Sequence, residues 1–455
     1  MDAVRAIAPR VERLNAREVA LAVVRDVFPA AGPERGAQES LEYRARKASL
    51  APPDRAFATE LAYGAIKMRR TLDWYLEPFV GGRPQPLPPA IREILRLGVY
   101  ELAYTLPDVH ATVFEFVNLA KRYGHRGLAN LANAVFRSFL RGQPAAPQRG
   151  AFESLEEYLG TRYSLPAWLV RQWLESFGER AEDVCAGVNE PARSAIVVNT
   201  LTGSRDALVD FLNAAGVETE PSPIVAESLL VRKPSALASL ESNDNGRWWQ
   251  QSESSAMPVD VLNPQPGEAV LDVCSGRGNK ALQIGARLRG EGSLLCIERD
   301  AKKASVLNER LQKAGIAAGT VVGDAAAELL EPGQLFDRIL VDAPCSGIGV
   351  VGRHPEARWK KLGTDGERLA LTQRAVLERS ARHVAPGGVL VYAVCSTDPR
   401  ETMEVVDWFL SRHPFERGLI PSAYETLLLD SGDVLVPPGI GGRDGFFIAR
   451  LESRR

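Results

Sequence analysis

The 455-residue sequence predicts a multidomain protein with an all-α bundle, a small α+β connecting module and a Rossmann-like α/β domain. Three observations support this fold class. The first third keeps apolar residues at helical spacing, and the next segment mixes helical with β-type runs. From about residue 265, short apolar strands alternate with longer helical patterns, which is typical of a mostly parallel sheet covered by helices. We expect the domains at 1–145, 151–240 and 241–455.

The first domain is predicted from four segments of helical periodicity, at 16–29, 54–78, 88–105 and 109–141. The sequence RGQPAAPQRG that follows breaks the periodicity with prolines and glycines, so we place a linker there. Residues 1–145 hold 21 Lys and Arg against 15 Asp and Glu. This net charge of +6 suits a polyanion such as RNA, but it is weak evidence, and chance segregation of charge is the simpler explanation.

The connecting module and the third domain are read from their strand patterns. In the module, helical runs accompany two β-type runs at 194–200 and 228–233. In the third domain, apolar strands are expected at 269–273, 293–298, 319–324, 337–343 and 387–394. Ligands of such sheets bind outside the carboxyl ends of the strands, so site residues are expected in the loops that follow.

Composition bounds the class of protein. Hydrophobic residues make up 45% and charged residues 25% of the chain, which excludes a disordered or collagen-like protein. We find no apolar run long enough to span a bilayer, and the first 20 residues lack the apolar core of a signal peptide. The five cysteines include no Cys-x-x-Cys pair, so we expect neither disulfides nor a metal site. We therefore expect a cytoplasmic monomer without a membrane partner.

The first loop of the third domain, in AVLDVCSGRGNKAL, predicts a site for an adenosine-containing cofactor. Gly276 and Gly278 allow a tight turn and a close approach of the backbone to a ligand. Glu298 ends the second strand, where a carboxylate can accept ribose hydroxyls, and Asp324 ends the third. The loop alone leaves NAD and S-adenosylmethionine open. Asp272 disfavours a pyrophosphate and favours a cationic sulfonium ligand, unless it only caps the loop.

Two cysteines, Cys345 in PCS and Cys395 in VCST, each follow an apolar strand. One such cysteine is usually a small buried hydrophobe, but two at successive strand ends beside a cofactor site favour chemistry. Methylation at carbon 5 of a pyrimidine can use them. A thiolate that adds to carbon 6 makes carbon 5 nucleophilic, and a base then removes the carbon-5 proton so that the thiolate can leave.

The sequence around the two cysteines resembles the bacterial Sun/Fmu (RsmB) type of rRNA cytosine-5 methyltransferase. The resemblance is carried by the motifs DAPCSG, GRHPEARW and YAVCSTDP. Residues 1–140 resemble the antitermination factor NusB through ATELAYGAIKMRRTLDWYL and REILRLGVYELAYT. The segment 151–240 resembles the connecting module of that enzyme through YSLPAWLVRQW and VVNT, and DGFFIARL resembles its last hairpin. The resemblance covers essentially the whole chain and implies an RNA partner, with small-subunit rRNA favoured over tRNA.

The resemblance also implies roles for single residues. Cys395 would be the nucleophile on carbon 6, and Cys345 would assist release of the methylated product. Asp342, close to Cys345 in sequence, would hold cofactor and also contact the target base. S-adenosylmethionine would be held by Cys274, Ser275, Gly276, Arg277, Gly278, Asn279, Lys280, Glu298, Asp324 and Asp342.

One departure from the family concerns the first loop, which usually reads Cys-Ala-Ala-Pro-Gly-Gly-Lys. Here Arg277 replaces the proline and Asn279 replaces a glycine. The arginine adds a cation near a cationic ligand, whereas asparagine tolerates the left-handed backbone that a turn requires. A NusB-like RNA-binding factor with a decayed catalytic domain is therefore an alternative. An NAD-dependent oxidoreductase would explain the loop but gives the two cysteine motifs no role.

The remaining candidates have two interpretations each. The basic loop after Cys345 would contact RNA phosphates or simply be solvated; its cations are Arg353, His354, Arg358, Lys360 and Lys361. Trp248 and Trp249 would stack on a base or adenine, or pack inside the protein. Cys296 and Cys185 are expected to be structural.

Overall fold

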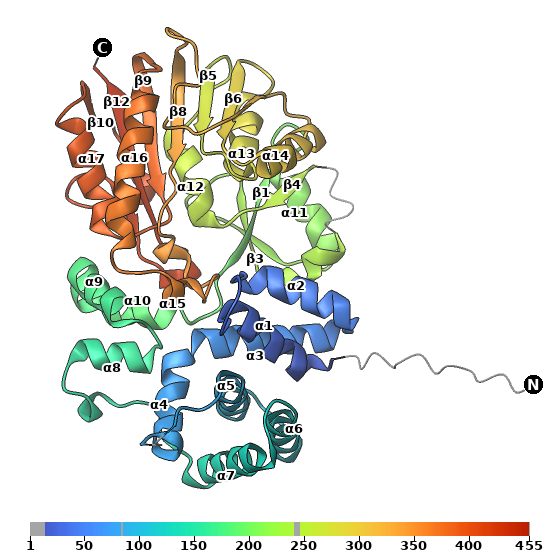
Figure 1. Ribbon diagram of the computed structural model, residues 1–455. Helices are drawn as coiled ribbons and strands as arrows, with labels where there is room; N and C mark the ends of the chain where they lie inside the picture. Colours follow the sequence, from blue (N-terminus) through green and yellow to red (C-terminus); the bar gives the residue numbers. More distant parts are fainter. Residues whose placement is uncertain (1–13, 83–84, 241–245, 455) are drawn as a thin grey trace, which may run out of the picture. The chain divides into compact units, whose positions relative to one another are not determined.

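The computed structural model describes residues 14–82, 85–240 and 246–454 (Figure 1). The N-terminal segment 1–13, which carries most of the signal-peptide prediction, lies outside the described residues. Contacts divide the chain into two compact units. The first contains the described residues up to Val170 together with His354–Lys360, and the second contains Arg171–Arg353 and the chain from Lys361 onward. Among the described helices, none is long and apolar enough to cross a membrane.

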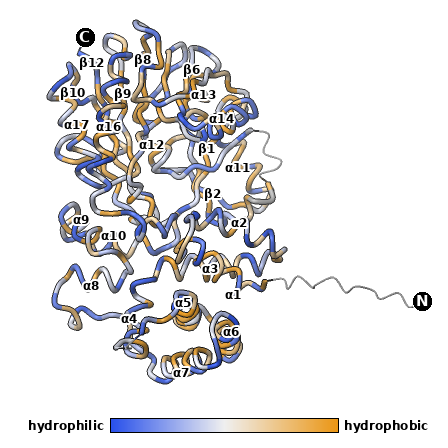
Figure 2. Tube along the Cα trace, viewed as in Figure 1, coloured by the Kyte–Doolittle hydropathy of each residue, from blue (hydrophilic) through white to orange (hydrophobic). Residues whose placement is uncertain are grey.

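The first unit is helical, as the sequence predicts. Its helices are α1 (Ala16–Val27), α2 (Ala37–Ala48), α3 (Pro52–Lys67), α4 (Arg69–Val80), α5 (Pro89–Tyr104), α6 (Val109–Arg122), α7 (Arg126–Gly142) and α8 (Leu155–Arg162), and α9 (Ala167–Phe177) leads into the second unit. Hydrophobic and hydrophilic turns alternate along α5, α6 and α7 in Figure 2, and the hydrophobic ones form one buried cluster. Two of the predicted helical segments, 54–78 and 109–141, each contain two helices. The first breaks at Met68, and the second breaks before His125, whose ring nitrogen caps α7.

The segment His354–Lys360, far along the chain, belongs to the helical unit and contains the short helix α15 (Ala357–Lys360). The indole nitrogen of Trp359 donates a hydrogen bond of 2.7 Å to the carbonyl oxygen of Ile66 in α3. Arg358 is fully buried, and Lys360 forms an ion pair of 3.0 Å with Glu34. This segment is therefore a structural part of the unit.

The second unit contains two sheets. The smaller is antiparallel, in the order β2-β3-β1-β4, and α10 (Ala181–Gly187) and α11 (Arg205–Ala214) belong to the same part of the chain. Its strands are β1 (Ser194–Val198), β2 (Thr219–Pro221), β3 (Ser228–Val231) and β4 (Trp248–Gln250). The two β-type runs predicted for the connecting module are thus confirmed as β1 and β3, while β4 joins the sheet from beyond the expected module.

The larger sheet has the order β10-β12-β9-β8-β5-β6-β7, with β11 paired to β12. Its strands are β5 (Ala269–Val273), β6 (Ser293–Glu298), β7 (Gly319–Val322), β8 (Phe336–Asp342), β9 (Val384–Val394), β10 (Phe415–Arg417), β11 (Val434–Val436) and β12 (Phe446–Ser453). The five strands predicted from the sequence are the parallel ones, β5 to β9, whereas β12 runs antiparallel to β9.

Helices cover both faces of this sheet, which confirms the predicted fold class. One face packs against α12 (Glu253–Leu262), α13 (Asn279–Leu288) and α14 (Ala301–Lys313). The other packs against α16 (Asp365–Ala381) and α17 (Met403–Leu410). Because both faces are buried, the central strands are nearly continuous runs of aliphatic residues, and polar residues are confined to their ends. The loops after β5, β8 and β9 hold the candidate site residues that the sequence predicts.

Candidate active site

The two strand-end cysteines meet at the carboxyl edge of the sheet. Strands β8 and β9 pair in parallel with Asp342 opposite Ala393, so the loops that follow them start side by side. Gly349, in the loop after β8, donates a backbone hydrogen bond of 3.1 Å to the carbonyl oxygen of Cys395. The Sγ atoms of Cys345 and Cys395 lie 3.2 Å apart, and both residues are half-buried. The sheet register thus brings together the two thiols that the sequence separates by 50 residues.

The thiol of Cys345 is a weaker acid than an ordinary cysteine. Its hydrogen bond with Cys395 raises the pKa of the Cys345 thiol well above its ordinary value, and burial and the negative charge of Glu401 raise it further. Cys345 therefore stays protonated at neutral pH, so its S–H is available as a hydrogen-bond donor at the site.

Glu401 joins the two cysteine loops and was not found from the sequence. Its side chain is fully buried and accepts a hydrogen bond of 2.8 Å from the backbone N–H of Ser346. The hydroxyl of Ser346 also donates to it, as does the hydroxyl of Ser396 at 2.6 Å. Gln373 of α16 donates a further bond of 3.0 Å. Each serine directly follows one cysteine, so one carboxyl group fixes both loops. The serine after each cysteine was the available signal.

The loop after β5 forms a cradle in which two of the three residues with a left-handed backbone are glycines. Gly276 has φ +59° and faces open space, since an added Cβ would meet no atom within 4 Å. Gly278 has φ +89°, and there a Cβ would lie 2.4 Å from Leu307. Glu298 holds the loop through a hydrogen bond of 2.8 Å from the backbone N–H of Gly276. The backbone is thus closely packed at Gly278 and open to a ligand at Gly276.

Two acidic residues, Asp272 and Asp342, lie close to this loop. Asp272 is fully buried, and neither of its carboxylate oxygens has a hydrogen-bond partner in the described part of the chain. Burial, and then the charge of Asp342, raise the pKa of Asp272 to about 7. Asp342 itself forms an ion pair of 2.7 Å with Lys280, the last residue of the family's loop motif. Buried carboxylate oxygens normally have a hydrogen-bond partner. A cationic ligand would supply the partner that the oxygens of Asp272 lack.

The other predicted cofactor residues surround the same loop. Cys274 adopts a left-handed backbone, with φ +64°, and burial raises the pKa of its thiol to about 12, so its side chain is inert. Ser275 is buried, and its hydroxyl donates to the carbonyl oxygen of Asp272. Asp324 is exposed after β7 and accepts a backbone hydrogen bond from Ala326. Asn279 is the first residue of α13 and needs no left-handed backbone, contrary to the sequence argument for its tolerance.

Several sequence candidates lie elsewhere. The basic loop after Cys345 is not an open cationic surface, because Arg353 binds Asp444 at 2.8 Å, Arg358 is buried and Lys360 is paired. Its cations already have protein partners, which contradicts the phosphate-contact interpretation for these three residues. Trp248 and Trp249 are nearly fully buried, so neither presents a face for stacking on a base. Cys296 and Cys185 are fully buried, as expected.

Three successive parts of the chain match models of known protein families. Residues 14–141 match the NusB family, 165–238 match the ferredoxin-like domain of RsmF/B-like methyltransferases, and 259–452 match the 16S rRNA methyltransferase RsmB/F family. The probable ribosomal RNA small subunit methyltransferase B of Bacillus subtilis strain 168 is 34% identical over 417 residues, which cover 89% of this chain and 92% of the relative. The chain belongs to the ribosomal RNA small subunit methyltransferase B family. A family member from Synechocystis sp. strain PCC 6803 is 31% identical over 97% of this chain and 100% of its own length.

Solved structures share the fold of this chain. The crystal structure of PH0851 is 25% identical, with a TM-score of 0.78, and covers 96% of this chain and 98% of its own. NSun6 from Pyrococcus horikoshii with SFG is 20% identical, with a TM-score of 0.56 over 64% of this chain and 98% of its own. The second likeness is one of fold.

Proposed function

We propose that this member of the ribosomal RNA small subunit methyltransferase B family transfers a methyl group from S-adenosylmethionine to carbon 5 of a cytosine in 16S rRNA. The reaction would pass through a covalent adduct between Cys395 and carbon 6 of the base. The observation that carries the proposal is the separation of 3.2 Å between the Sγ atoms of Cys345 and Cys395 at the sheet edge that also carries the glycine loop. The names of the relatives support small-subunit rRNA over tRNA.

The glycine-loop cradle fits the proposed cofactor in charge and in shape. The orphaned carboxylate of Asp272 supplies negative charge for a cationic ligand, and the open space above Gly276 leaves room for it. Glu298 and Asp324 stand where ribose hydroxyls are accepted in such folds. The chain from Cys274 to Lys280 would contribute largely through its backbone. When bound, S-adenosylmethionine supplies an electrophilic methyl group.

The chemistry begins at Cys395. Its thiolate sulfur forms a bond to carbon 6, and the electron pair of the C5–C6 double bond becomes available at carbon 5. Carbon 5 would then form a bond to the methyl group as the bond from that methyl to the sulfonium sulfur of the donor breaks and the sulfur leaves as a neutral thioether; carbon 5 becomes saturated and still carries its original hydrogen. Cys345 stabilises the attacking thiolate by donating its S–H to it. Glu401 keeps both sulfur atoms in place through the two neighbouring serines.

Product release reverses the addition. A base removes the proton from carbon 5, the electrons restore the C5–C6 double bond, and the bond from carbon 6 to the sulfur of Cys395 breaks. The neutral thiol of Cys345, 3.2 Å from that sulfur, stabilises the departing thiolate by a hydrogen bond. Loss of Cys345 would therefore slow elimination and trap the adduct.

The proposed rRNA substrate has consequences for how the protein binds RNA and for where in the cell it acts. A cytosine inside a helix must leave its stack to reach Cys395. The NusB-like unit, through its basic residues, would contribute backbone and shape recognition of the RNA. Bacterial rRNA is met in the cytoplasm, where we propose that this protein acts. Two thiols in contact and an intact acidic cradle disfavour the alternative of a decayed enzyme.

Bisulfite sequencing of rRNA and tRNA from cells with and without this protein tests the proposal. We expect one 16S cytosine to lose its methyl group in the deletion strain and to regain it when the wild-type chain is restored. Restoration with Cys395→Ala should fail. An unchanged 16S pattern together with a lost tRNA methyl group would overturn the choice of substrate, and no change in either RNA would overturn the assigned reaction.

A further inference from the structure

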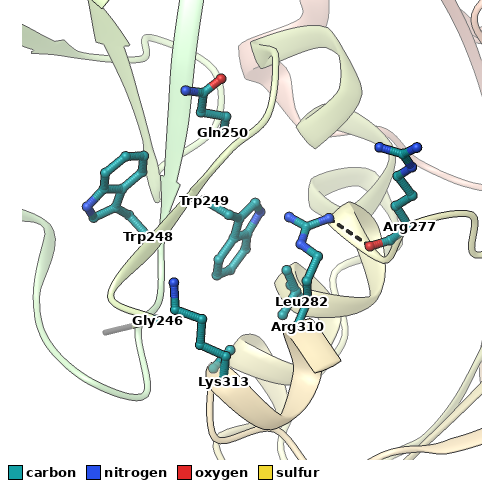
Figure 3. Close-up of a pocket in the computed structure, with 9 residues that line it drawn as sticks. Gly246, Trp248, Trp249, Gln250, Arg277, Leu282, Arg310 and Lys313 are labelled. Atoms are coloured by element: carbon teal, nitrogen blue, oxygen red, sulfur yellow. Dashed lines mark hydrogen bonds between the residues drawn. The ribbon is translucent and has the colours of Figure 1, made fainter. Parts of the chain in front are cut away.

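A cavity of about 520 Å³ lies beside the glycine loop, between β4 and the helices α13 and α14. Figure 3 shows two cationic side chains of α14 beside it, those of Arg310 and Lys313, whereas Arg277 of the loop turns its carbonyl oxygen toward Arg310 and its guanidinium group away. Trp249 and Leu282 line it as well and are nearly fully buried. No carboxylate is among the described residues that line this cavity.

Two arginines contribute positive charge near the cavity. The Nη1 atom of Arg310 donates a hydrogen bond of 2.7 Å to the carbonyl oxygen of Arg277, which fixes the Arg310 side chain beside the loop (Figure 3). Burial, and then the positive charge of Arg277, lower the pKa of Arg310. Both effects oppose the guanidinium charge. A bound anion would relieve the repulsion between the two cations.

The geometry of these groups points to phosphate as the ligand chemistry. Arginine side chains bind phosphate oxygens with two parallel N–H groups, and an added lysine contributes a movable point charge. Arg277 and Lys313 are exposed, so the anion can be part of a long polymer. The acidic cradle residues Asp272 and Asp342 do not line the cavity, which separates its ligand from the cationic cofactor.

We propose that this cavity, lined by Arg277, Arg310 and Lys313, binds a backbone phosphate of the substrate RNA. The proposal rests on the proposed function for the nature of the polymer. Arg277, which replaces the proline of the family's loop, would contribute to this phosphate site through its carbonyl oxygen, which holds the side chain of Arg310 in place. This chain would thereby hold the RNA strand against the same loop that holds the methyl donor.

RNA binding measured at several salt concentrations tests this site. The probe is a 16S rRNA fragment that the wild-type protein methylates, titrated by fluorescence anisotropy. We expect Arg310→Gln to weaken binding roughly tenfold near 0.1 M salt and to reduce the slope of log K against log salt by about 0.7 to 0.9, the loss of one phosphate contact. Lys313→Gln should act in the same direction, and Arg310→Lys should restore part of the slope. Lys302→Gln, the same charge change at the other end of α14, is the control and should change the slope less.

Calorimetry with S-adenosylmethionine separates this site from the cofactor cradle. The cofactor affinity of Arg310→Gln should equal that of the wild type. Should Arg310→Gln disturb the loop and lower that affinity, Lys313→Gln decides the outcome. If neither variant changes RNA affinity or slope while the wild type binds RNA, the phosphate site is overturned and the proposed function stands. A wild type that binds no RNA overturns both.

A free anion is the competing occupant. Inorganic phosphate at 1 to 20 mM, followed by the melting temperature of each protein, reports on it. A phosphate-dependent rise that Arg310→Gln abolishes, combined with an unchanged RNA slope, would overturn RNA as the ligand. A reduced RNA slope in the variant supports the RNA backbone, whether or not free phosphate also binds.

Discussion

The backbone N–H of Ser346 donates a hydrogen bond of 2.8 Å to the carboxyl group of Glu401, 55 residues further along the chain. This bond ties the loop after β8 to the loop after β9. The same carboxyl group holds Ser396, so the distance between Cys345 and Cys395 depends on one buried side chain. The arrangement makes Glu401 a positioning residue for both thiols.

Glu401→Gln should therefore lower kcat about 10- to 100-fold with little change in RNA affinity, because misplacing a nucleophile by a fraction of an ångström has effects of this size. An amide keeps the volume but presents N–H where Ser346 also donates. Single-turnover methylation and RNA titration measure the two quantities. Glu404→Gln, an exposed neighbour on α17, is the matched control and should behave as wild type. A Glu401→Gln protein with wild-type kcat would show that the thiols hold their positions unaided.

Cys395→Ala should remove methyl transfer entirely, because the neighbouring thiol of Cys345 has a raised pKa, stays protonated and does not replace the lost nucleophile. The assay follows tritium from labelled S-adenosylmethionine into 16S rRNA. Its control is Cys185→Ala, a buried cysteine outside the site. Methyl transfer by Cys395→Ala at even a tenth of the wild-type rate would contradict a covalent mechanism.

Cys345→Ala should methylate once and then remain attached to the RNA. Without the neutral thiol at 3.2 Å, the departing sulfur of Cys395 has no hydrogen-bond donor and elimination slows. A denaturing gel should show a protein–RNA band that is absent from wild type and from the Cys345→Ala/Cys395→Ala double variant. Normal turnover without such a band would refute the product-release role.

Affinity for S-adenosylmethionine should fall as the pH drops from 8 to 6. Asp272 has a pKa of about 7, so it is mostly ionised at pH 8 and mostly neutral at pH 6. Calorimetry should show this trend in wild type, whereas Asp272→Asn should bind weakly and without the trend. The exposed carboxylate variant Asp430→Asn serves as control.

The same pKa predicts an opposite trend in stability. Because the pKa of Asp272 is higher in the folded than in the unfolded chain, the folded state binds more protons at this residue between about pH 4 and pH 7. The free energy of unfolding contributed by Asp272 therefore falls as the pH rises through that window. Urea unfolding of wild type and Asp272→Asn across the window should show the difference growing toward pH 7.

The two glycines of the cradle should respond differently to alanine. At Gly276 only the left-handed backbone is strained, at about 1 to 2 kcal/mol, but the new methyl group occupies the open space and should weaken cofactor binding. At Gly278 the methyl group also meets Leu307 at 2.4 Å, so we expect a loss of about 2 to 4 kcal/mol in unfolding free energy. Urea denaturation and calorimetry separate the two effects. Equal losses of stability would contradict the described packing.

Much of the fold follows from local sequence patterns. The parallel strands β5 to β9 were predictable because buried strands are continuous apolar runs, and the two cysteines could be placed at one edge because β8 and β9 follow each other along the chain. The antiparallel partner β12 arrives from the far end of the chain, and no local pattern reports its register. The helix break at Met68 was missed because Met68 is itself apolar and keeps the periodicity.

The site was predicted in part for a similar reason. The cysteines and glycines of the site can be recognised in the sequence by residue type. Glu401 cannot, because it is one of many acidic residues and only the folded structure shows that it contacts both cysteine loops. Arg277 was assigned to the cofactor by its place in the loop, and that assignment stays a prediction; the sequence did not show that Arg277 also lines the neighbouring cavity, where its carbonyl oxygen accepts a hydrogen bond from Arg310. The charge of the loop after Cys345 suggested contact with RNA phosphates. The sequence did not show that Trp359 attaches this loop to the helical unit.

That attachment has a practical consequence for dissecting the protein. A fragment ending at residue 170 would lack the peptide 354–360 and would leave the carbonyl oxygen of Ile66 without the indole that caps it. A single cut at residue 170, inside α9, thus removes one piece of the helical unit, and adding that heptapeptide in trans would be the natural way to complete it.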